Sequence, residues 1–311
     1  MRLTVLGGYL GSGKSTWLRH QLYARTFGRV HVIVNEAAEV PVDDVLLGAA
    51  QNLTVLAGGC VCCDAREALI SALRDLCDRR TRAGADPVDH IVLETSGLAD
   101  PAPIVTAFLK DPILVHHIVL SEIVVAVDGM HALEQLRDAP LGRQQIEAAD
   151  RLILTKSDIA PAGSLAQLIA TLRRLNPGAS IGAAHKGTQV PLPEVPLGTK
   201  VAVLPDSHSQ EPVTPTRLQI DPAIDWTAFC VWLSALLHAR GHDIVRVKGV
   251  VQTPSGRLLV QSVRRIVQSP EILPANTAGD AANDNVVVFI GRGFCHDDLQ
   301  RSLEYFAGHT P

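Results

Sequence analysis

Short runs of aliphatic residues alternate with longer segments of helical periodicity through the first half of the chain. Between the runs, apolar residues recur every three or four positions, as in Arg66–Arg80, which is typical of an amphipathic helix. Runs that are apolar on both faces and alternate with helices predict an α/β fold, with a mostly parallel sheet flanked by helices. The predicted strands are Leu3–Leu6, Val30–Val34, Leu53–Leu56, His90–Leu93, Ile123–Val127 and Leu152–Thr155.

This alternation lapses in a proline-rich stretch. Six prolines fall between Lys186 and Thr216, and proline interrupts helices and sheet ladders alike. One short strand is expected inside this stretch, at Lys200–Leu204. The predicted domains are therefore 1–187 and 216–311, joined by a linker at 188–215.

The second domain is predicted to be a smaller α+β unit. Asp225 is a good N-cap for a helix that carries apolar residues on one face. Two β-branched runs, Ile244–Gln252 and Leu258–Val263, are expected to form a hairpin. A further strand at Val286–Ile290 and a last helix at Asp297–Phe306 complete the pattern.

Composition narrows the class of protein. Hydrophobic residues make up 47% of the 311 residues and charged residues 19%, which excludes a disordered chain. A net charge of −4 without a run of Lys or Arg argues against nucleic acid and anionic membranes as partners. Because no apolar stretch approaches the ~18 residues of a spanning helix and the N-terminus lacks the features of a signal peptide, a cytoplasmic protein is expected.

The segment Gly8–Ser15 has the spacing G-x-x-x-x-G-K-S directly after a predicted strand and before a predicted helix. In that context glycines let backbone N–H groups point inward around an anion, and the helix N-terminus adds its dipole. We expect Lys14 to bridge the β- and γ-phosphates of a nucleotide and the Ser15 hydroxyl to bind Mg²⁺.

A second motif indicates which base is bound. The segment Thr155–Asp158 reads T-K-x-D at the end of an apolar strand. In GTP-binding proteins the aspartate of this motif accepts hydrogen bonds from N1–H and the 2-amino group of guanine, and the lysine stem packs on the ring. Adenine lacks this pair of donors, so Lys156 and Asp158 favour GTP.

An acidic residue also ends the strand His90–Leu93. Glu94 is expected to hold Mg²⁺, directly or through water, and to help order the attacking water. Gly97, three residues later, is expected to donate its N–H to the γ-phosphate and so to sense hydrolysis.

Three cysteines fall within four residues, at Cys60, Cys62 and Cys63. Three thiolates suit a soft or borderline ion such as Zn²⁺ and leave one tetrahedral position open, which is what a transferable ion needs. The short spacing and the expected compartment disfavour a disulfide. The isolated Cys77, Cys230 and Cys295 are expected to be core residues.

These motifs, taken in order, resemble the CobW-type metallochaperone GTPases, which are relatives of the urease and hydrogenase nickel-delivery GTPases. The resemblance rests on Gly7–Thr16, Asn35–Asp43, Cys60–Cys63, Glu94–Pro101 and Thr155–Asp158. The later segments Arg246–Gly249 and Phe289–Gly293 look like the C-terminal domain of that family, so the resemblance covers nearly the whole chain.

The resemblance implies a Mg²⁺-dependent GTPase with a slow intrinsic rate and a transition metal, usually zinc with cobalt as the alternative, at the cysteine motif. Nucleotide state would control that site and its delivery to a client metalloprotein, by a monomer or a nucleotide- or metal-dependent homodimer. The implied phosphate and base contacts come from Gly8, Gly11, Ser12, Gly13, Lys14, Ser15, Thr16, Thr155, Lys156 and Asp158. Asp43 and Glu94 are candidates for the Mg²⁺ and water shell, and Glu36 and Glu39 for auxiliary metal or switch residues.

The segment Asn35–Asp43, called the switch segment below, departs from the usual family pattern. Ala38 and Pro41 stand where glycines are common, so this segment is expected to be stiffer and its response to nucleotide altered.

Two other interpretations of the chain stay open at this point. A P-loop kinase of a small metabolite would need adenine specificity and an acceptor pocket, and an adaptor without enzymatic output would hold zinc as a structural ion.

Overall fold

The chain folds into two compact units, Met1–Pro205 and Asp206–Pro311. The computed structural model describes residues 1–36, 52–57, 63–81, 88–205, 213–241, 243–263, 265–268, 270–273 and 284–308.

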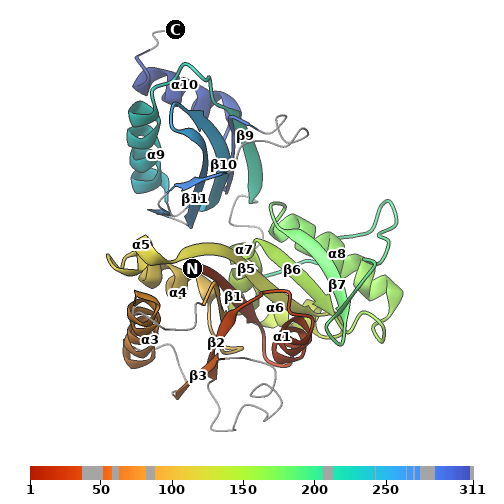
Figure 1. Ribbon diagram of the computed structural model, residues 1–311. Coiled ribbons are helices and arrows are strands. Elements are labelled where there is room, and N and C mark those ends of the chain that lie inside the picture. Colours follow the sequence, from red (N-terminus) through yellow and green to blue (C-terminus); the bar gives the residue numbers. More distant parts are fainter. Residues whose placement is uncertain are drawn as a thin grey trace. The chain divides into compact units, whose positions relative to one another are not determined.

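In the first unit, the described residues form an eight-stranded sheet in the order β3-β2-β4-β1-β5-β6-β7-β8 (Figure 1). All neighbouring pairs are parallel except β7 and β8, which form an antiparallel hairpin at one edge. The strands are β1 Arg2–Gly8, β2 Val30–Glu36, β3 Asn52–Ala57, β4 His90–Glu94, β5 Val119–Asp128, β6 Arg151–Thr155, β7 Ser180–His185 and β8 Thr188–Val190. The predicted mostly parallel α/β fold is confirmed.

Helices cover both faces of this sheet. Alternate residues of β1 face opposite ways, and neighbouring residues of β1 approach helices on opposite faces. Leu6 packs with Trp17 and Leu18 of α1 on one face. A Cβ placed on the next residue, Gly7, would lie 3.6 Å from Pro101 of α4, on the other face. The helices are α1 Lys14–Tyr23, α3 Cys63–Thr81, α4 Pro101–Leu109, α5 Leu114–His117, α6 Ala132–Asp138, α7 Pro140–Ala148 and α8 Ala162–Leu175.

In its described residues, the second unit has an antiparallel sheet and the helices α9 and α10, which confirms the predicted α+β unit. Its main strands run in the order β12-β11-β10-β14-β9, with β13 paired to β11. The bounds are β9 Thr214–Gln219, α9 Trp226–Arg240, β10 Ile244–Thr253, β11 Gly256–Val263, β12 Ile266–Val267, β13 Glu271–Ile272, β14 Val286–Gly291 and α10 His296–Phe306. Asp225 caps α9 as expected, since its carboxylate accepts from Ala228 N at 3.0 Å.

Two expectations about local structure were wrong. The segment Lys200–Leu204 is not a strand. Its alternation buries Ala202 and Leu204, but the Ala202 amide donates to the Thr171 hydroxyl of α8 at 3.0 Å, so the segment lies against a helix. Cys295 is exposed rather than part of the core, because it is the N-cap residue of α10.

The outer residues of the proline-rich stretch belong to strands. Thr188–Val190 is β8, and β9 begins at Thr214, so both ends of the predicted linker 188–215 are hydrogen-bonded into a sheet. Cys77 is buried, and Cys230 is partly buried against the core of the second unit.

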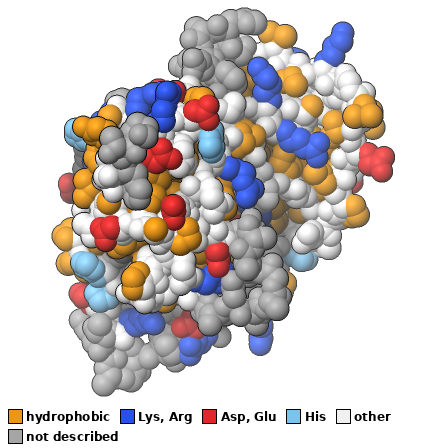
Figure 2. Space-filling view, turned by 90° about the horizontal axis from the view of Figure 1, so that it is seen from above, with side chains coloured by type: hydrophobic (Ala, Val, Ile, Leu, Met, Phe, Trp, Pro, Cys, Tyr) orange, Lys and Arg blue, Asp and Glu red, His pale blue; other side chains and the backbone are white. Residues whose placement is uncertain are grey.

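Charges of both signs share the surface. Figure 2 shows Lys and Arg side chains interspersed with Asp and Glu on the face in view, which matches the near balance of 28 basic and 32 acidic residues. Among the helices that the structure describes, none has the length and apolar character needed to cross a bilayer.

The core of the second unit generates a stability prediction. Leu233 of α9 is 2% exposed among the core residues Phe229, Trp232 and Phe289, so Leu233→Ala leaves a cavity and should cost about 2–5 kcal/mol of unfolding free energy. Val231, on the same helix, is 53% exposed, and Val231→Ala is the matched control, with a change within ~0.5 kcal/mol. Urea denaturation followed by tryptophan fluorescence measures both, and equal losses would contradict this packing.

Candidate functional site

The described residues of the predicted nucleotide site lie where four neighbouring parallel strands end. β4, β1, β5 and β6 lie side by side in the sheet, and the carboxyl ends of parallel strands meet at one edge. The loops after these strands carry Glu94–Gly97, Gly8–Gly13, Asp128–His131 and Thr155–Asp158. In open α/β sheets this edge is where ligands bind.

The loop between β1 and α1 requires glycine at particular positions. Gly8, Gly11 and Gly13 have φ of 135°, 73° and 84°, a region that residues with a Cβ rarely adopt. A Cβ on Gly8 would also lie 2.4 Å from the carbonyl oxygen of Ala126. The turn can therefore curl tightly, and it leads into α1 at Lys14.

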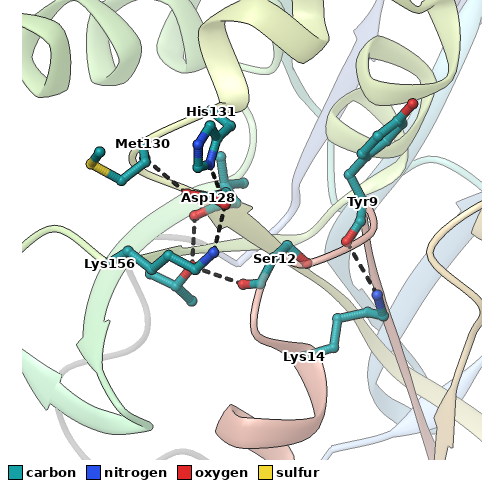
Figure 3. Close-up of polar contacts among 9 residues, drawn as sticks. Tyr9, Ser12, Lys14, Asp128, Met130, His131 and Lys156 are labelled. Atoms are coloured by element: carbon teal, nitrogen blue, oxygen red, sulfur yellow. Dashed lines mark hydrogen bonds and ion pairs between the residues drawn. The ribbon is translucent and has the colours of Figure 1, made fainter. Parts of the chain in front are cut away.

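The Lys14 ammonium is held over this loop. Its Nζ donates to the carbonyl oxygens of Gly8 at 3.0 Å and Tyr9 at 3.2 Å, and the side chain is buried. Figure 3 shows the Tyr9 ring pointing away from Lys14, and Tyr9 lines a small cavity with Val125 and Gln145. The positive charge thus lies at the loop that is predicted to bind phosphates.

Ser12 ties the phosphate loop to the base motif. Thr155 Oγ1 lies 2.8 Å from the Ser12 carbonyl oxygen and 3.1 Å from the Val127 carbonyl oxygen, and its single proton is shared between these two acceptors. The Ser12 hydroxyl is buried and has no hydrogen-bond partner among the described residues. Because buried polar groups are nearly always paired, this hydroxyl is suited to a ligand oxygen.

The structure brings Ser15 and Glu94 together. Ser15 Oγ, in the first turn of α1, donates to Glu94 Oε1 at 2.6 Å, and Glu94 is 1% exposed. Thr16, the next residue of α1, is partly buried. A hydroxyl and a carboxylate oxygen at this position are the hard donors that Mg²⁺ prefers.

Gly97 lies directly against the phosphate loop. A Cβ on Gly97 would be 2.7 Å from the backbone nitrogen of Leu10, so only glycine fits this approach. Gln145 of α7 holds the segment in place, since its Nε2 donates to the carbonyl oxygen of Ala99 at 2.8 Å and that of Gly97 at 3.4 Å. No motif in the sequence marks Gln145, which lies in the middle of α7.

The Lys156 side chain binds the buried carboxylate of Asp128, which no motif in the sequence marks either. Lys156 Nζ donates to Asp128 Oδ2 at 2.7 Å, and His131 Nδ1 lies 3.1 Å from the same oxygen (Figure 3). Burial raises the pKa of Asp128, but the hydrogen bonds from Lys156, His131 and the Met130 amide outweigh burial and lower it. An acid directly after the apolar run Ile123–Val127 was the signal available in the sequence.

Asp158 has a partner on β7, on the other side of β6 from Asp128. Its Oδ2 lies 3.0 Å from Nε2 of His185, at the end of β7. Both side chains are partly exposed, at 36% and 45% respectively. The T-K-x-D residues that are predicted to contact the base therefore have partners on β5 and β7, the two strands that flank β6.

Several predicted residues lie outside the described residues: Glu39, Asp43, Cys60 and Cys62, together with Ala38 and Pro41. Glu36 ends β2 and Cys63 begins α3, and their side chains are not described either. In the part of the chain that the structure describes, no three His, Cys, Asp or Glu side chains are grouped to hold a metal.

The strands that lead into these segments are neighbours. β2 and β3 are parallel and end side by side, with Glu36 opposite Ala57. Val34 of β2 is in turn opposite Glu94 of β4. The strand that precedes the cysteine segment is thus two strands away from the strand that carries Glu94.

Comparison with protein families assigns both units. Residues 2–182 match the model of the CobW/HypB/UreG nucleotide-binding domain, and residues 213–307 match the cobalamin synthesis protein cobW C-terminal domain.

The chain is also similar to characterised proteins over most of its length. It is 31% identical to zinc chaperone YjiA of Escherichia coli, over 98% of each chain, and 32% identical to zinc chaperone CobW of Pseudomonas aeruginosa, over 84% of this chain and 80% of that one. The crystal structure of Zn(II)-bound YjiA GTPase from E. coli superposes with a TM-score of 0.62 and 25% identity, covering 100% of this chain and 99% of that chain.

The Asp128 network generates a prediction about stability and pH. Asp128→Asn removes charge-assisted hydrogen bonds to a buried group, so it should lower the free energy of unfolding by about 1–3 kcal/mol at pH 7. A carboxyl whose folded pKa is lowered contributes stability above its unfolded pKa of ~3.9, and that contribution disappears as the pH falls through the folded value. The deficit of Asp128→Asn, measured by urea denaturation, should therefore persist from pH 8 to pH 5. A deficit that disappears within that range contradicts the lowered pKa.

Proposed function

This chain belongs to the CobW/HypB/UreG family, and from that premise we propose that it is a GTP-hydrolysing metallochaperone that binds zinc and delivers it to a client metalloprotein. The observation that carries the nucleotide part is the hydrogen bond from Thr155 to the Ser12 carbonyl, because it joins the base motif to the phosphate loop in one site. The metal part is supported by the cysteine motif and by the zinc chaperones to which the chain is similar.

In the proposed complex, the phosphates of GTP lie in the loop of Gly8, Gly11, Ser12 and Gly13, at the N-terminus of α1. The buried Ser12 hydroxyl donates to a phosphate oxygen and so gains the partner that it lacks among the described residues. The Lys14 ammonium exchanges its bonds to the carbonyls of the loop for bonds to phosphate, which is the stronger acceptor because it is charged.

The base lies over Lys156, and the Asp158 carboxylate accepts from N1–H and the 2-amino group of guanine. Asp128 is expected to keep the Lys156 stem in place, since its buried carboxylate binds the ammonium at 2.7 Å.

The donors of Ser15 and Glu94 fit a magnesium ion. Their oxygens are already 2.6 Å apart, and Asp43 is proposed as a further ligand. Mg²⁺ bound there would neutralise charge on the β- and γ-phosphates. Glu94 orders the attacking water, and Gly97, whose backbone touches the phosphate loop, donates its N–H to the γ-phosphate. Intrinsic hydrolysis is expected to be slow, since no arginine finger is evident from the sequence motifs.

Cys60, Cys62 and Cys63 are proposed to hold zinc as the cargo, with cobalt as the alternative ion and Glu36 and Glu39 as auxiliary ligands or switch residues. The order β3-β2-β4 supports coupling to the nucleotide. The switch segment follows β2 in the chain. On one side β2 pairs with β4, which carries Glu94, and on the other side it pairs with β3, which leads to the cysteines. A displacement of the switch on hydrolysis would therefore reach the cysteine segment through adjacent strand ends.

Zinc affinity tests this coupling. We expect competition with a chromogenic chelator to give different zinc affinities in the presence of a GTP analogue, GDP and no nucleotide. Replacing Cys60, Cys62 and Cys63 by Ser should abolish tight binding, whereas Cys295→Ser, at an exposed thiol outside the motif, should leave it unchanged. Equal affinities in the three nucleotide states would refute the coupling.

The same samples separate a carried ion from a structural one. A chain that carries zinc as cargo should keep its circular dichroism spectrum and its urea midpoint after chelation. Unfolding on chelation would favour the adaptor with structural zinc.

Nucleotide selectivity tests the GTPase assignment. A carboxylate that accepts two hydrogen bonds from guanine discriminates by about 1–3 kcal/mol, so we expect GDP to bind about tenfold or more tightly than ADP in isothermal titration calorimetry with Mg²⁺. Lys14→Ala should abolish hydrolysis of GTP. A preference for ADP would instead favour the P-loop kinase.

A further inference from the structure

His185 lies at the base end of the site, yet it belongs to no nucleotide motif. Its Nε2 is 3.0 Å from Asp158 Oδ2. In the described part of the chain, His185 is the polar partner that the structure gives to the Asp158 side chain. The two residues come from different strand ends, since Asp158 follows β6 and His185 ends β7.

The backbone at His185 is fixed by a tight turn. His185 pairs with Thr188 across the antiparallel hairpin of β7 and β8. The two residues between them, Lys186 and Gly187, both have positive φ, at 48° and 94°, which is the conformation of a two-residue hairpin turn. His185 therefore has little freedom to move along or away from the sheet edge.

The β7–β8 turn also packs against α1, the helix that follows the phosphate loop. The Gly187 carbonyl oxygen accepts from Gln21 Nε2 at 3.1 Å, and Thr188 Oγ1 lies 3.1 Å from His20 Nε2. A Cβ on Gly187 would lie 2.3 Å from the Cβ of His20, so the approach of the turn to α1 requires glycine. The position of His185 is thereby set relative to the phosphate loop.

A carboxylate accepts hydrogen bonds from both N1–H and the 2-amino group of guanine only when both of its oxygens face the base. Asp158 is 36% exposed, and an exposed aspartate samples several rotamers, of which few present both oxygens correctly. A contact at Oδ2 from a group on a fixed backbone selects among those rotamers. His185 Nε2 lies 3.0 Å from Oδ2 as an ion-pair contact. Each carboxylate oxygen has two lone-pair sites, so Oδ2 can keep this contact and accept a hydrogen bond from the base at the same time.

We propose that His185 is a positioning residue for guanine recognition, which holds the Asp158 carboxylate in the orientation that reads N1–H and the 2-amino group. This inference rests on the proposed GTP function. In this proposal, each flanking strand supplies a residue that orients one side chain of the T-K-x-D motif. Asp128 of β5 orients Lys156, and His185 of β7 orients Asp158.

The test compares GDP with inosine 5′-diphosphate, which has N1–H but lacks the 2-amino group. In His185→Ala we expect the Kd of GDP to rise about fivefold or more, with a smaller change for inosine 5′-diphosphate, so that the ratio of the two affinities falls. His185→Gln keeps a side-chain N–H donor and should restore part of the ratio. His116→Ala, at an exposed histidine elsewhere in the first unit, is the matched control.

A general loss of structure would lower both affinities equally and leave their ratio unchanged, and this result would overturn the proposal. Asp158→Ala makes the source of a failure identifiable. If Asp158→Ala leaves the ratio unchanged, the guanine assignment itself is wrong. If Asp158→Ala lowers the ratio and His185→Ala does not, only the role of His185 is rejected. In the Asp158→Ala background, adding His185→Ala should have no further effect on the ratio.

Discussion

The hydrogen bonds of the Thr155 hydroxyl hold the candidate site together. The single proton of this group is shared between the carbonyl oxygens of Ser12 and Val127, and so the hydroxyl joins the phosphate loop to the strands β5 and β6. A Cβ on Gly13 would contact the Thr155 side chain at 3.7 Å, which shows how closely the loop approaches the base strand. The phosphate loop and the T-K-x-D segment are therefore fixed relative to each other.

The side chains around this junction are held by residues that need not touch a ligand. Asp128 grips Lys156, and Gln145 fixes the segment of Gly97. On the other flank, the β7–β8 turn packs on α1 and carries His185 to Asp158. This is the arrangement that preorganises a site, because the cost of ordering the contacting groups is met in folding rather than in binding.

The order of the strands places the strand that leads to the cysteine motif beside the strands of the candidate nucleotide site. β3, β2 and β4 are consecutive in the sheet although α3 separates β3 from β4 in the chain. The parallel pairing of β2 with β3 puts the strand before the cysteine segment next to the strand before the switch segment. The sequence pattern alone gave these strands but not their order.

The sequence by itself determined the parallel α/β fold, the α+β unit and the motifs with their residues, because hydrophobic period and the need for glycine are local properties. Only the tertiary structure decided that Lys200–Leu204 covers α8 instead of pairing as a strand, that Cys295 is exposed, and that Asp128, Gln145 and His185 contact residues of the candidate site. These contacts join residues 28, 46 and 27 positions apart, and a pairing across the sheet leaves no periodic trace in a single chain.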